Sequence, residues 1–457
     1  MGDGLRDTMA GSLGAGNDGQ SVRLAGWVAS RRDHGGVIFL DLRDASGVVQ
    51  VVVDPVAQPQ AAAVAHDVRL EYCLSVSGAV RLRPDGTINP DMETGEVEVA
   101  ADGVTVLSSA DPLPFQIDDR LDVDEAKRLE FRYLDLRRPR MAANLRARSS
   151  AIGAIRRSMD EQGFLEVETP TLIRSTPEGA RDLLVPSRLR KGSFYALPQS
   201  PQLFKQLLMV AGVDRYYQIA RCYRDEDTRA DRQIEFTQLD VEGAFWGQDD
   251  VHHAIETAVA KAVEAVRGVA PALPLPKMTY AEAMARFGTD KPDLRFGMEL
   301  VDLSVVFGAT EFNAFSGVLA DGGVIKGINA GNQGELSRSA LDQVVAQAQE
   351  LGAKGLVWMV VEDDGTLRSP VAKFLSDTEL SDITGSLSAS TGELLLIVAD
   401  APAVVANVLG ELRLQYGQPD GHDELNFLWI IDFPVFETTA DGSLVPAHHP
   451  FTAPVDV

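Results

Sequence analysis

The stretch that decides the fold is PQSPQLFKQLLMVAGVDRYYQIARCYRDEDTRADRQIEFTQLDVEG, residues 198–243. It begins with a helix start, in which Ser200 supplies a capping hydroxyl and Pro201 occupies the first helical position. An alternating strand that runs into a polar turn follows at 216–227, and a returning strand follows at 232–243. They predict an antiparallel hairpin in which alternate residues share one face, so polar side chains gather on one side of a sheet.

The predicted helix and hairpin carry side chains suited to a ligand with polar and anionic groups. Gln202 and Lys205, three residues apart, share one face of the helix. On the hairpin, Arg224, Glu226 and Phe236 suit a nucleotide, with a guanidinium on phosphate, a carboxylate or backbone group on adenine, and a ring stacked on the base. The same charges also fit simple cross-strand pairing, and Gln202 and Lys205 also fit an ordinary surface helix.

Length and composition indicate a multidomain protein. The 457 residues exceed one typical domain, and 45% apolar with 24% charged residues is typical of globular chains. No apolar run approaches the ~20 residues that span a bilayer, and the N-terminus lacks the apolar core of a secretory signal. Cys73 and Cys222 fit a reducing cytoplasm, and the histidines and cysteines show no metal-ligand spacing. We therefore expect a cytoplasmic protein without a membrane segment.

The charge pattern is ambiguous about nucleic acid. A net charge of −25 argues against a phosphate-rich partner. Residues 127–157, however, carry ten lysines and arginines against two acidic residues, Glu130 and Asp135, which leaves a local excess of ten minus two, or +8. Such a run fits nucleic-acid contact and a solvated helix face equally well.

Composition and patterning divide the chain into six segments. They are 1–20 (a tail), 21–110 (a barrel), 111–139 (a hinge or linker), 140–290 (the main domain), 291–420 (an inserted α/β module) and 421–457 (a return to the main domain). The pattern of the second segment predicts five short strands, and five strands in so short a segment predict an OB-fold. In it, Arg32, His34 and Phe39 offer charge and an aromatic platform for unpaired bases, although Phe39 also fits a core position of an alternating strand.

Other elements of the main domain also have sequence signals. Leu145, Ile152, Ile155 and Met159 recur at helical spacing, and Gly163 is placed to end that helix. FLEVETPTL (164–172) then predicts a strand that stops at its proline, and LNFLWIIDFPVFE (425–437) predicts long apolar strands.

From about residue 20 to its last residue, the chain resembles the bacterial aspartyl-tRNA synthetases, which are class II enzymes. The matching strings, in order, are GWV, RRDHGGVIFLDLRD, FRYLDLRRP, TPEGARD, ALPQSPQLFKQLLM, RCYRDED, RADRQ, EFTQLD, TDKPDLR, SPVAKFL and HHPFT. The resemblance implies a multidomain α+β fold, with an OB-fold anticodon-binding barrel, a class II catalytic domain built on an antiparallel sheet, and a bacterial insertion domain at 291–420.

The resemblance also implies a reaction and partners. ATP and L-aspartate would form aspartyl-adenylate, and the aspartyl group would pass to the 3′ end of tRNA-Asp. The helix from Asn144 and the strand ending at Pro170 resemble motif 1, a homodimer interface, and the Arg224 hairpin resembles motif 2. His34 and Gly86 resemble forms that also charge tRNA-Asn, so we expect a non-discriminating enzyme.

The site residues implied by the resemblance fall into four sets. The catalytic residue is Arg224. The aspartate-binding residues are Glu178, Ser200, Gln202, Lys205, Arg224, Asp240 and His448. The ATP-binding residues are Arg224, Glu226, Gln233 and Phe236. The anticodon and discrimination residues are Arg32, His34, Phe39, Gln50 and Gly86.

Two departures from the family pattern matter. Ile234 stands where the family usually has proline, for which we expect a mild effect. The chain stops at Val457, before motif 3, so the Mg²⁺ ligands of the family would lie beyond its end. We therefore expect an incomplete sequence of a full enzyme. The alternative is a truncated, catalytically incompetent paralogue that binds tRNA, although it would be free to lose Arg224, Gln202 and Lys205, and none is lost. An asparaginyl enzyme would normally lack the insertion.

Overall fold

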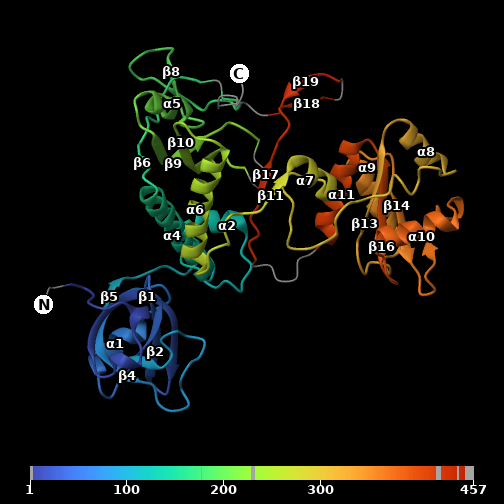
Figure 1. Ribbon diagram of the computed structural model, residues 1–457. Coiled ribbons are helices and arrows are strands. Elements are labelled where there is room, and N and C mark those ends of the chain that lie inside the picture. Colours follow the sequence, from blue (N-terminus) through green and yellow to red (C-terminus); the bar gives the residue numbers. More distant parts are fainter. Residues whose placement is uncertain (1–3, 177, 228–231, 418–423, 440–441, 448–457) are drawn as a thin grey trace. The chain divides into compact units, whose positions relative to one another are not determined.

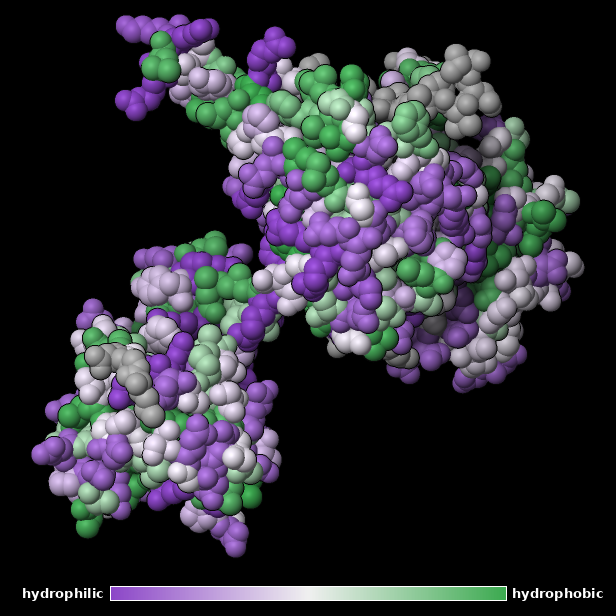
Figure 2. Space-filling model, turned by 60° about the vertical axis from the view of Figure 1, so that its left-hand side comes forward, coloured by the Kyte–Doolittle hydropathy of each residue, from purple (hydrophilic) through white to green (hydrophobic). Residues whose placement is uncertain are grey.

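The computed structural model describes residues 4–176, 178–227, 232–417, 424–439 and 442–447. The chain forms two compact units, Met1–Ser149 and Ser150–Val457. On the face drawn in Figure 2, hydrophobic and hydrophilic residues are interspersed, as expected for a globular chain of this composition.

The first unit contains a closed five-stranded barrel, blue in Figure 1, with strand order β1-β2-β3-β5-β4. Its strands are β1 (Ser21–His34), β2 (Val37–Arg43), β3 (Val48–Val53), β4 (Cys73–Leu82) and β5 (Val97–Ser108). Alternate residues such as Leu24, Leu40 and Val51 point inward and are fully buried. The predicted OB-fold barrel is confirmed. The helix α1 (Pro59–Asp67), between β3 and β4, was not predicted from the sequence. Two short 3-10 turns, η1 (Ala10–Ser12) and η2 (Ala15–Asn17), precede the barrel.

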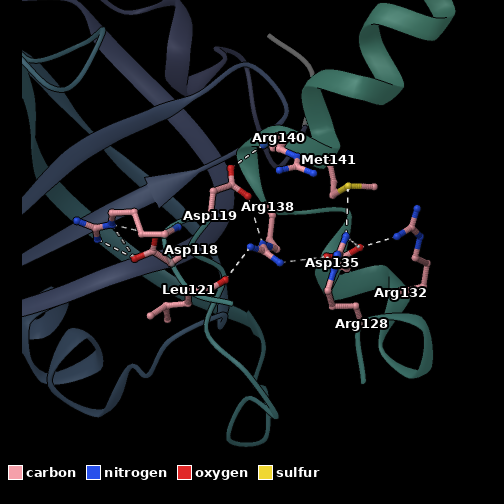
Figure 3. Close-up of polar contacts among 10 residues, drawn as sticks. Asp118, Asp119, Leu121, Arg128, Arg132, Asp135, Arg138, Arg140 and Met141 are labelled. Carbon is pink, nitrogen blue, oxygen red and sulfur yellow. Dashed lines mark hydrogen bonds and ion pairs between the residues drawn. The ribbon is translucent and has the colours of Figure 1, made fainter. Parts of the chain in front are cut away.

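The segment after the barrel forms α2 (Glu125–Glu130), α3 (Arg132–Asp135) and the start of α4 (Pro139–Glu161). The Asp135 carboxylate is inaccessible to solvent, and it accepts hydrogen bonds from Arg128 Nε at 2.9 Å and Arg132 Nη1 at 2.5 Å. Arg138 Nη1 lies 3.7 Å away, and Figure 3 shows Asp135 among these arginines.

A second ion-pair cluster attaches this segment to the barrel. Glu71 accepts hydrogen bonds from Arg43 and Arg137, and the Arg137 guanidinium lies 4.7 Å from the ring centre of Trp27. Four of the ten basic residues at 127–157, Arg128, Arg132, Arg137 and Arg138, therefore face the buried carboxylates of Asp135 and Glu71. For the rest of the run, a solvated face and nucleic-acid contact both stay predictions.

In the second unit a small sheet with order β10-β9-β6 positions the polar residues of the hairpin. Its strands are β6 (Leu165–Glu166), β9 (Arg215–Tyr223) and β10 (Glu235–Gly243), and the last two are antiparallel with Cys222 opposite Phe236 and Gln218 opposite Asp240. One face of this sheet packs Tyr217, Leu239 and Val241 against Met159 of α4 and against Ala254 and Ala258 of α6 (Gln248–Arg267). The helix α5 (Gln202–Val210) contacts β9 and β10. A hairpin of β7 (Leu184–Pro186) and β8 (Phe194–Ala196) precedes that helix in the sequence.

The rest of the second unit holds an α/β module, orange in Figure 1. Its sheet has the order β12-β13-β16-β14-β15. The strands are β12 (Val301–Asp302), β13 (Val324–Asn329), β14 (Val357–Val361), β15 (Leu367–Arg368) and β16 (Leu394–Asp400). The helices are α8 (Asn313–Ala320), α9 (Arg338–Glu350), η3 (Ala372–Phe374), α10 (Asp377–Ser386) and α11 (Pro402–Tyr416). The two faces of this sheet carry separate apolar cores.

Two strand predictions were wrong in extent. The predicted strand at 164–172 is regular only at Leu165–Glu166, and further along Thr169 uses its hydroxyl to bond Gln218. The segment 425–437 forms only β17 (Trp429–Ile431), parallel to β11 (Lys277–Thr279), and the start of β18 (Phe436–Thr438), which pairs with β19 (Leu444–Pro446). Asp432 has φ of +57° and Pro434 lacks an N–H, which together interrupt a continuous strand. The helix α7 (Tyr280–Phe287) follows β11.

Candidate active site

A polar surface covers the face of the β9–β10 hairpin that points away from α4 and α6. Because strand residues alternate, the register that sends Tyr217 and Leu239 into the apolar core sends their neighbours to the opposite side. That opposite side carries Tyr216, Gln218 and Cys222 from β9, and Phe236, Gln238 and Asp240 from β10. The predicted hairpin is confirmed, together with its division into two faces.

Lys205 and Asp240 form the most buried ion pair of this surface. Lys205 Nζ lies 2.9 Å from Asp240 Oδ1 and 3.4 Å from Glu242 Oε2. Among the residues that the structure describes, Asp240 Oδ2 and the neighbouring Gln202 Nε2 are buried without a hydrogen-bond partner. A buried acceptor and a buried donor left unpaired cost free energy unless a ligand meets them. These two atoms therefore indicate a binding site for a molecule with a cation and an acceptor oxygen.

The β9 side chains beside this pair are bonded to one another and are not reactive. Gln218 Oε1 accepts hydrogen bonds from Thr169 Oγ1 and Tyr216 OH, each at 3.0 Å. Burial, reinforced by Asp240, raises the pKa of Tyr216 well above its ordinary value. Burial also raises the pKa of the Cys222 thiol to about 11, and that thiol donates to Gln238 Oε1 at 3.1 Å. Both groups stay protonated near neutral pH, so they shape the surface rather than act as nucleophiles.

Arg224 and Phe236 lie together at the end of the hairpin. The Arg224 guanidinium is 5.1 Å from the ring centre of Phe236, and the Arg224 backbone N–H donates to Ile234 O at 2.9 Å. Glu226 and Arg232 form an exposed pair at 3.8 Å, and Gln233 beside them is exposed. An arginine held against an aromatic ring can present its N–H groups to an anion while the ring offers a face to a base.

Ser200, just before α5, is hydrogen-bonded to the carboxylate of Glu178. Ser200 Oγ donates to Glu178 Oε2 at 2.6 Å and lies 3.3 Å from the backbone N–H of Gln202. The helix begins at Gln202 with Pro201 as its N-cap, so the prediction of Ser200 as the cap was wrong by one residue. The predicted site residue His448 lies outside the described residues.

One buried residue of this region, Gln199, was not predicted from the sequence. Gln199 is 2% exposed and bonds the backbone of Ala180 and the side chain of Asp182. The only signal in the sequence is a glutamine directly before Ser200, and it does not distinguish a buried amide from an exposed one.

A hollow of roughly 380 Å³ opens on the barrel of the first unit. Arg32, His34, Phe39, Gln50 and Gly86 all line it, so the structure brings together the five predicted residues of the barrel. Phe39 is half-buried in this hollow and is not a core residue, and the His34 ring lies edge-on to it at 6.0 Å.

Ion pairs and hydrogen bonds hold the side chains of the hollow in place. Arg32 Nη2 donates to Asp41 Oδ1 at 2.9 Å and to Gln50 Oε1 at 3.1 Å, and Gln50 Nε2 donates to Glu98 Oε2 at 2.9 Å. Arg83, which also lines the hollow, was missed. It donates to Val97 O at 3.0 Å, and burial lowers its pKa.

Within 4–176, 178–227, 232–417, 424–439 and 442–447, no three His, Cys, Asp or Glu side chains form a group that could hold a metal ion. In the same ranges, no helix has the length and apolar character needed to cross a membrane.

Comparison with protein families matches both units. Residues 124–456 match the family described as tRNA synthetases class II (D, K and N), and residues 22–107 match the OB-fold nucleic acid binding domain. The aspartate–tRNA(Asp/Asn) ligase of Moorella thermoacetica is 52% identical over 450 residues, covering 98% of this chain and 75% of that protein. The enzyme of the same name from Bacillus subtilis is 52% identical over 443 residues, covering 96% of this chain and 75% of that protein.

Solved structures share the fold. The asparaginyl-tRNA synthetase of Pyrococcus horikoshii complexed with asparaginyl-adenylate has a TM-score of 0.54 at 18% identity, covering 92% of this chain and 100% of that chain. The asparaginyl-tRNA synthetase of Entamoeba histolytica in complex with asparaginyl-adenylate has a TM-score of 0.51 at 21% identity, covering 61% of this chain and 67% of that chain.

Proposed function

The chain belongs to the class II tRNA synthetases, in the family of the aspartate–tRNA(Asp/Asn) ligases, and from that membership we propose its reaction. It activates L-aspartate with ATP to form aspartyl-adenylate and pyrophosphate, and then transfers the aspartyl group to the 3′ end of tRNA-Asp. The observation that carries this proposal is the Lys205–Asp240 pair, beside which Gln202 Nε2 and Asp240 Oδ2 are left for a ligand.

Aspartate suits this pair because it carries two carboxylates and an ammonium. We assign the ammonium to Asp240 Oδ2, with Ser200 and the side-chain oxygen of Gln202 as further acceptors, and the side-chain carboxylate to Lys205. Gln202 Nε2 is then left for an oxygen of the substrate. Glu178 is held against Ser200, where it adds negative charge on the ammonium side of the pocket. His448 completes the proposed aspartate set by similarity with the family.

ATP is assigned to the Arg224 end of the hairpin. Arg224 contacts the α-phosphate and, in the transition state, stabilises the charge that develops there, because a pre-placed donor costs no reorganisation. Phe236 stacks on adenine, and Glu226 and Gln233 contact the nucleotide from the exposed side. Mg²⁺ would supply the charge neutralisation that phosphoryl groups need. We assign none of the described residues to it.

The hollow of the barrel is the proposed reader of the anticodon. It combines an aromatic ring with a fixed guanidinium and amide, which suits a splayed, unpaired base. We propose that the enzyme charges tRNA-Asn as well as tRNA-Asp. His34 and Gly86 at the rim, together with relatives named for both tRNAs, support this.

We also propose a homodimer in the cytoplasm. Strand β6 lies at the edge of its sheet with Leu165 exposed, and α5 exposes Leu203, Leu207 and Val210. An open sheet edge and exposed leucines on a helix are each typical of a surface covered by a second copy. Both cysteines are free, which suits a reducing compartment. We further propose that residues 291–420 are the insertion domain of the bacterial enzymes.

Pyrophosphate exchange tests the reaction. The protein should convert labelled pyrophosphate into ATP when aspartate is added, and asparagine should not replace aspartate. Exchange supported by asparagine alone would instead identify an asparaginyl enzyme, and exchange with neither amino acid would contradict the proposal.

A further inference from the structure

We propose that Gln199 is a positioning residue that holds Glu178 at the aspartate pocket, and this inference rests on the proposed function. The amide of Gln199 bonds both backbone groups of one residue. Its Nε2 donates to Ala180 O at 2.8 Å, and the Ala180 N–H donates to Gln199 Oε1 at 3.1 Å. Two opposed hydrogen bonds to one peptide segment fix its position and its orientation, as a strand partner would.

The two hydrogen bonds between Gln199 and Ala180 form a clasp, and a third hydrogen bond of Gln199 extends it to Asp182. Gln199 Nε2 also donates to Asp182 Oδ1 at 2.5 Å, and Ser175 Oγ donates to Asp182 Oδ2 at 2.5 Å. Residues on both sides of Glu178 in the sequence are therefore tied, directly or through one carboxylate, to Gln199. Since Gln199 is 2% exposed, water has little access to its amide, and losing the amide would leave the partly buried polar groups of Ala180 and Asp182 unpaired.

Holding Ala180 limits how far Glu178 can move, because only one residue, Gly179, lies between them. Gly179 adopts φ of +103°, and a Cβ there would meet nothing within 4 Å. A glycine in open space resists rotation weakly, so Glu178 keeps its place only while both ends of this short segment are held, Ala180 by Gln199 and the Glu178 carboxylate by Ser200. Ser200, which bonds the Glu178 carboxylate at 2.6 Å, directly follows Gln199. One dipeptide thus holds the backbone of this segment and also receives its carboxylate.

The structural step is tested without enzyme activity. In Gln199→Ala, hydrogen exchange of the peptide containing the Ala180 amide should accelerate about tenfold or more, since a buried hydrogen bond is lost. Gln206→Ala, the same deletion at an exposed position of α5, should leave that exchange unchanged. Unchanged protection of Ala180 in Gln199→Ala overturns the proposal, even if the assay of the proposed reaction fails.

The functional step is tested by the split between KM and kcat in pyrophosphate exchange. Gln199→Ala should raise KM for aspartate about tenfold, while kcat and KM for ATP change less than about threefold, because the clasp acts on the amino-acid pocket. In a Glu178→Ala background the same change should add little, since Gln199 acts through Glu178. An unchanged KM for aspartate, or full additivity of the two changes, overturns the proposal.

A single variant and a double variant at Gln199 and Asp182 distinguish the loss of this contact from a general loss of folding. Gln199→Glu keeps the acceptor for the Ala180 N–H but places a carboxylate against Asp182, so KM for aspartate should rise. Adding Asp182→Asn restores a donor between the two side chains. In this double variant, the increase in log KM for aspartate should be at most half of the increase in Gln199→Glu. If the double variant is no better than Gln199→Glu, the contact does not set the position of Glu178.

Discussion

The ammonium of Lys205 and the carboxylate of Asp240 come from a helix and a strand 35 residues apart in the sequence, yet they lie 2.9 Å from each other. Both side chains are at most 12% exposed. The pair brings a positive and a negative group to the same part of the polar face of the hairpin, as a ligand that carries both charges requires.

Breaking this pair should abolish aspartate binding. Lys205→Met leaves a buried carboxylate unpaired and removes the partner of the substrate carboxylate, so aspartate affinity should fall about a hundredfold or more. Isothermal titration with aspartate measures it, and Lys191→Met at an exposed position is the control. Unchanged affinity in Lys205→Met would place the amino acid elsewhere.

Arg224→Lys keeps the charge but loses the planar fork of donors. We expect the rate of pyrophosphate exchange to fall by about 10²- to 10³-fold, with a smaller change in KM for aspartate. Arg221→Lys is the matched control, since Arg221 lies on the opposite face of the same strand and pairs with Glu235. Equal losses in the two variants would indicate damage to the hairpin rather than to catalysis.

Asp135→Asn should destabilise the first unit in a pH-dependent way. The hydrogen bond from Arg128 holds the pKa of Asp135 below its ordinary value. A depressed pKa contributes stability that is complete above the unfolded value near ~4 and is lost as the pH falls through the folded value. The cost should therefore be about 2 kcal/mol at pH 7, since the arginines are partly exposed, and it should shrink below pH ~4.

Urea denaturation at pH 7 and pH 3.5 measures that cost. Asp118→Asn is the control, because Asp118 pairs with the exposed Arg120, which lowers its pKa to about 2 in a solvent-screened setting. A loss in Asp135→Asn that is equal at both pH values would show that the ionised carboxylate is not responsible.

His34→Leu should alter tRNA choice. His34 lines the barrel hollow beside Phe39, so the change should reduce charging of tRNA-Asn relative to tRNA-Asp by about tenfold. Phe39→Leu should instead weaken both reactions through lost stacking. Aminoacylation of the two purified tRNAs measures the ratio, and an unchanged ratio in His34→Leu would remove this residue from discrimination.

Cys222 should resist alkylation in the folded protein. Its pKa of about 11 leaves roughly one thiolate in a thousand at pH 8, and the side chain is buried. In a Cys73→Ser background, iodoacetamide labelling followed by mass spectrometry should be slow until urea unfolds the chain. Rapid labelling of the folded protein would show that the polar face opens to solvent.

The sequence predicts those parts of the structure that depend on local alternation. The five barrel strands and the two faces of the Arg224 hairpin follow from period-two patterns, and the structure confirms both. The family resemblance is confirmed as well. The structure brings Gln202, Lys205 and Asp240 together, whereas their roles toward aspartate stay predictions.

The missed features depend on contacts between distant residues. Gln199 meets Ala180 across 19 residues, and Arg137 meets Glu71 across 66, so no local pattern reveals either pair. The basic run at 127–157 shows the same limit, because charge counting sees Arg128 and Arg132 but not that Asp135 lies buried between them.

The register of β9 and β10 also restricts how the length of this chain can change. One residue inserted within either strand would exchange its faces, turning Tyr217 toward the pocket and polar side chains toward the helices. Two inserted residues would restore the faces but carry every later side chain about 7 Å along the strand, so Asp240 would leave the reach of Lys205. Within this hairpin, length changes that keep both faces in register are therefore confined to the connection between the strands.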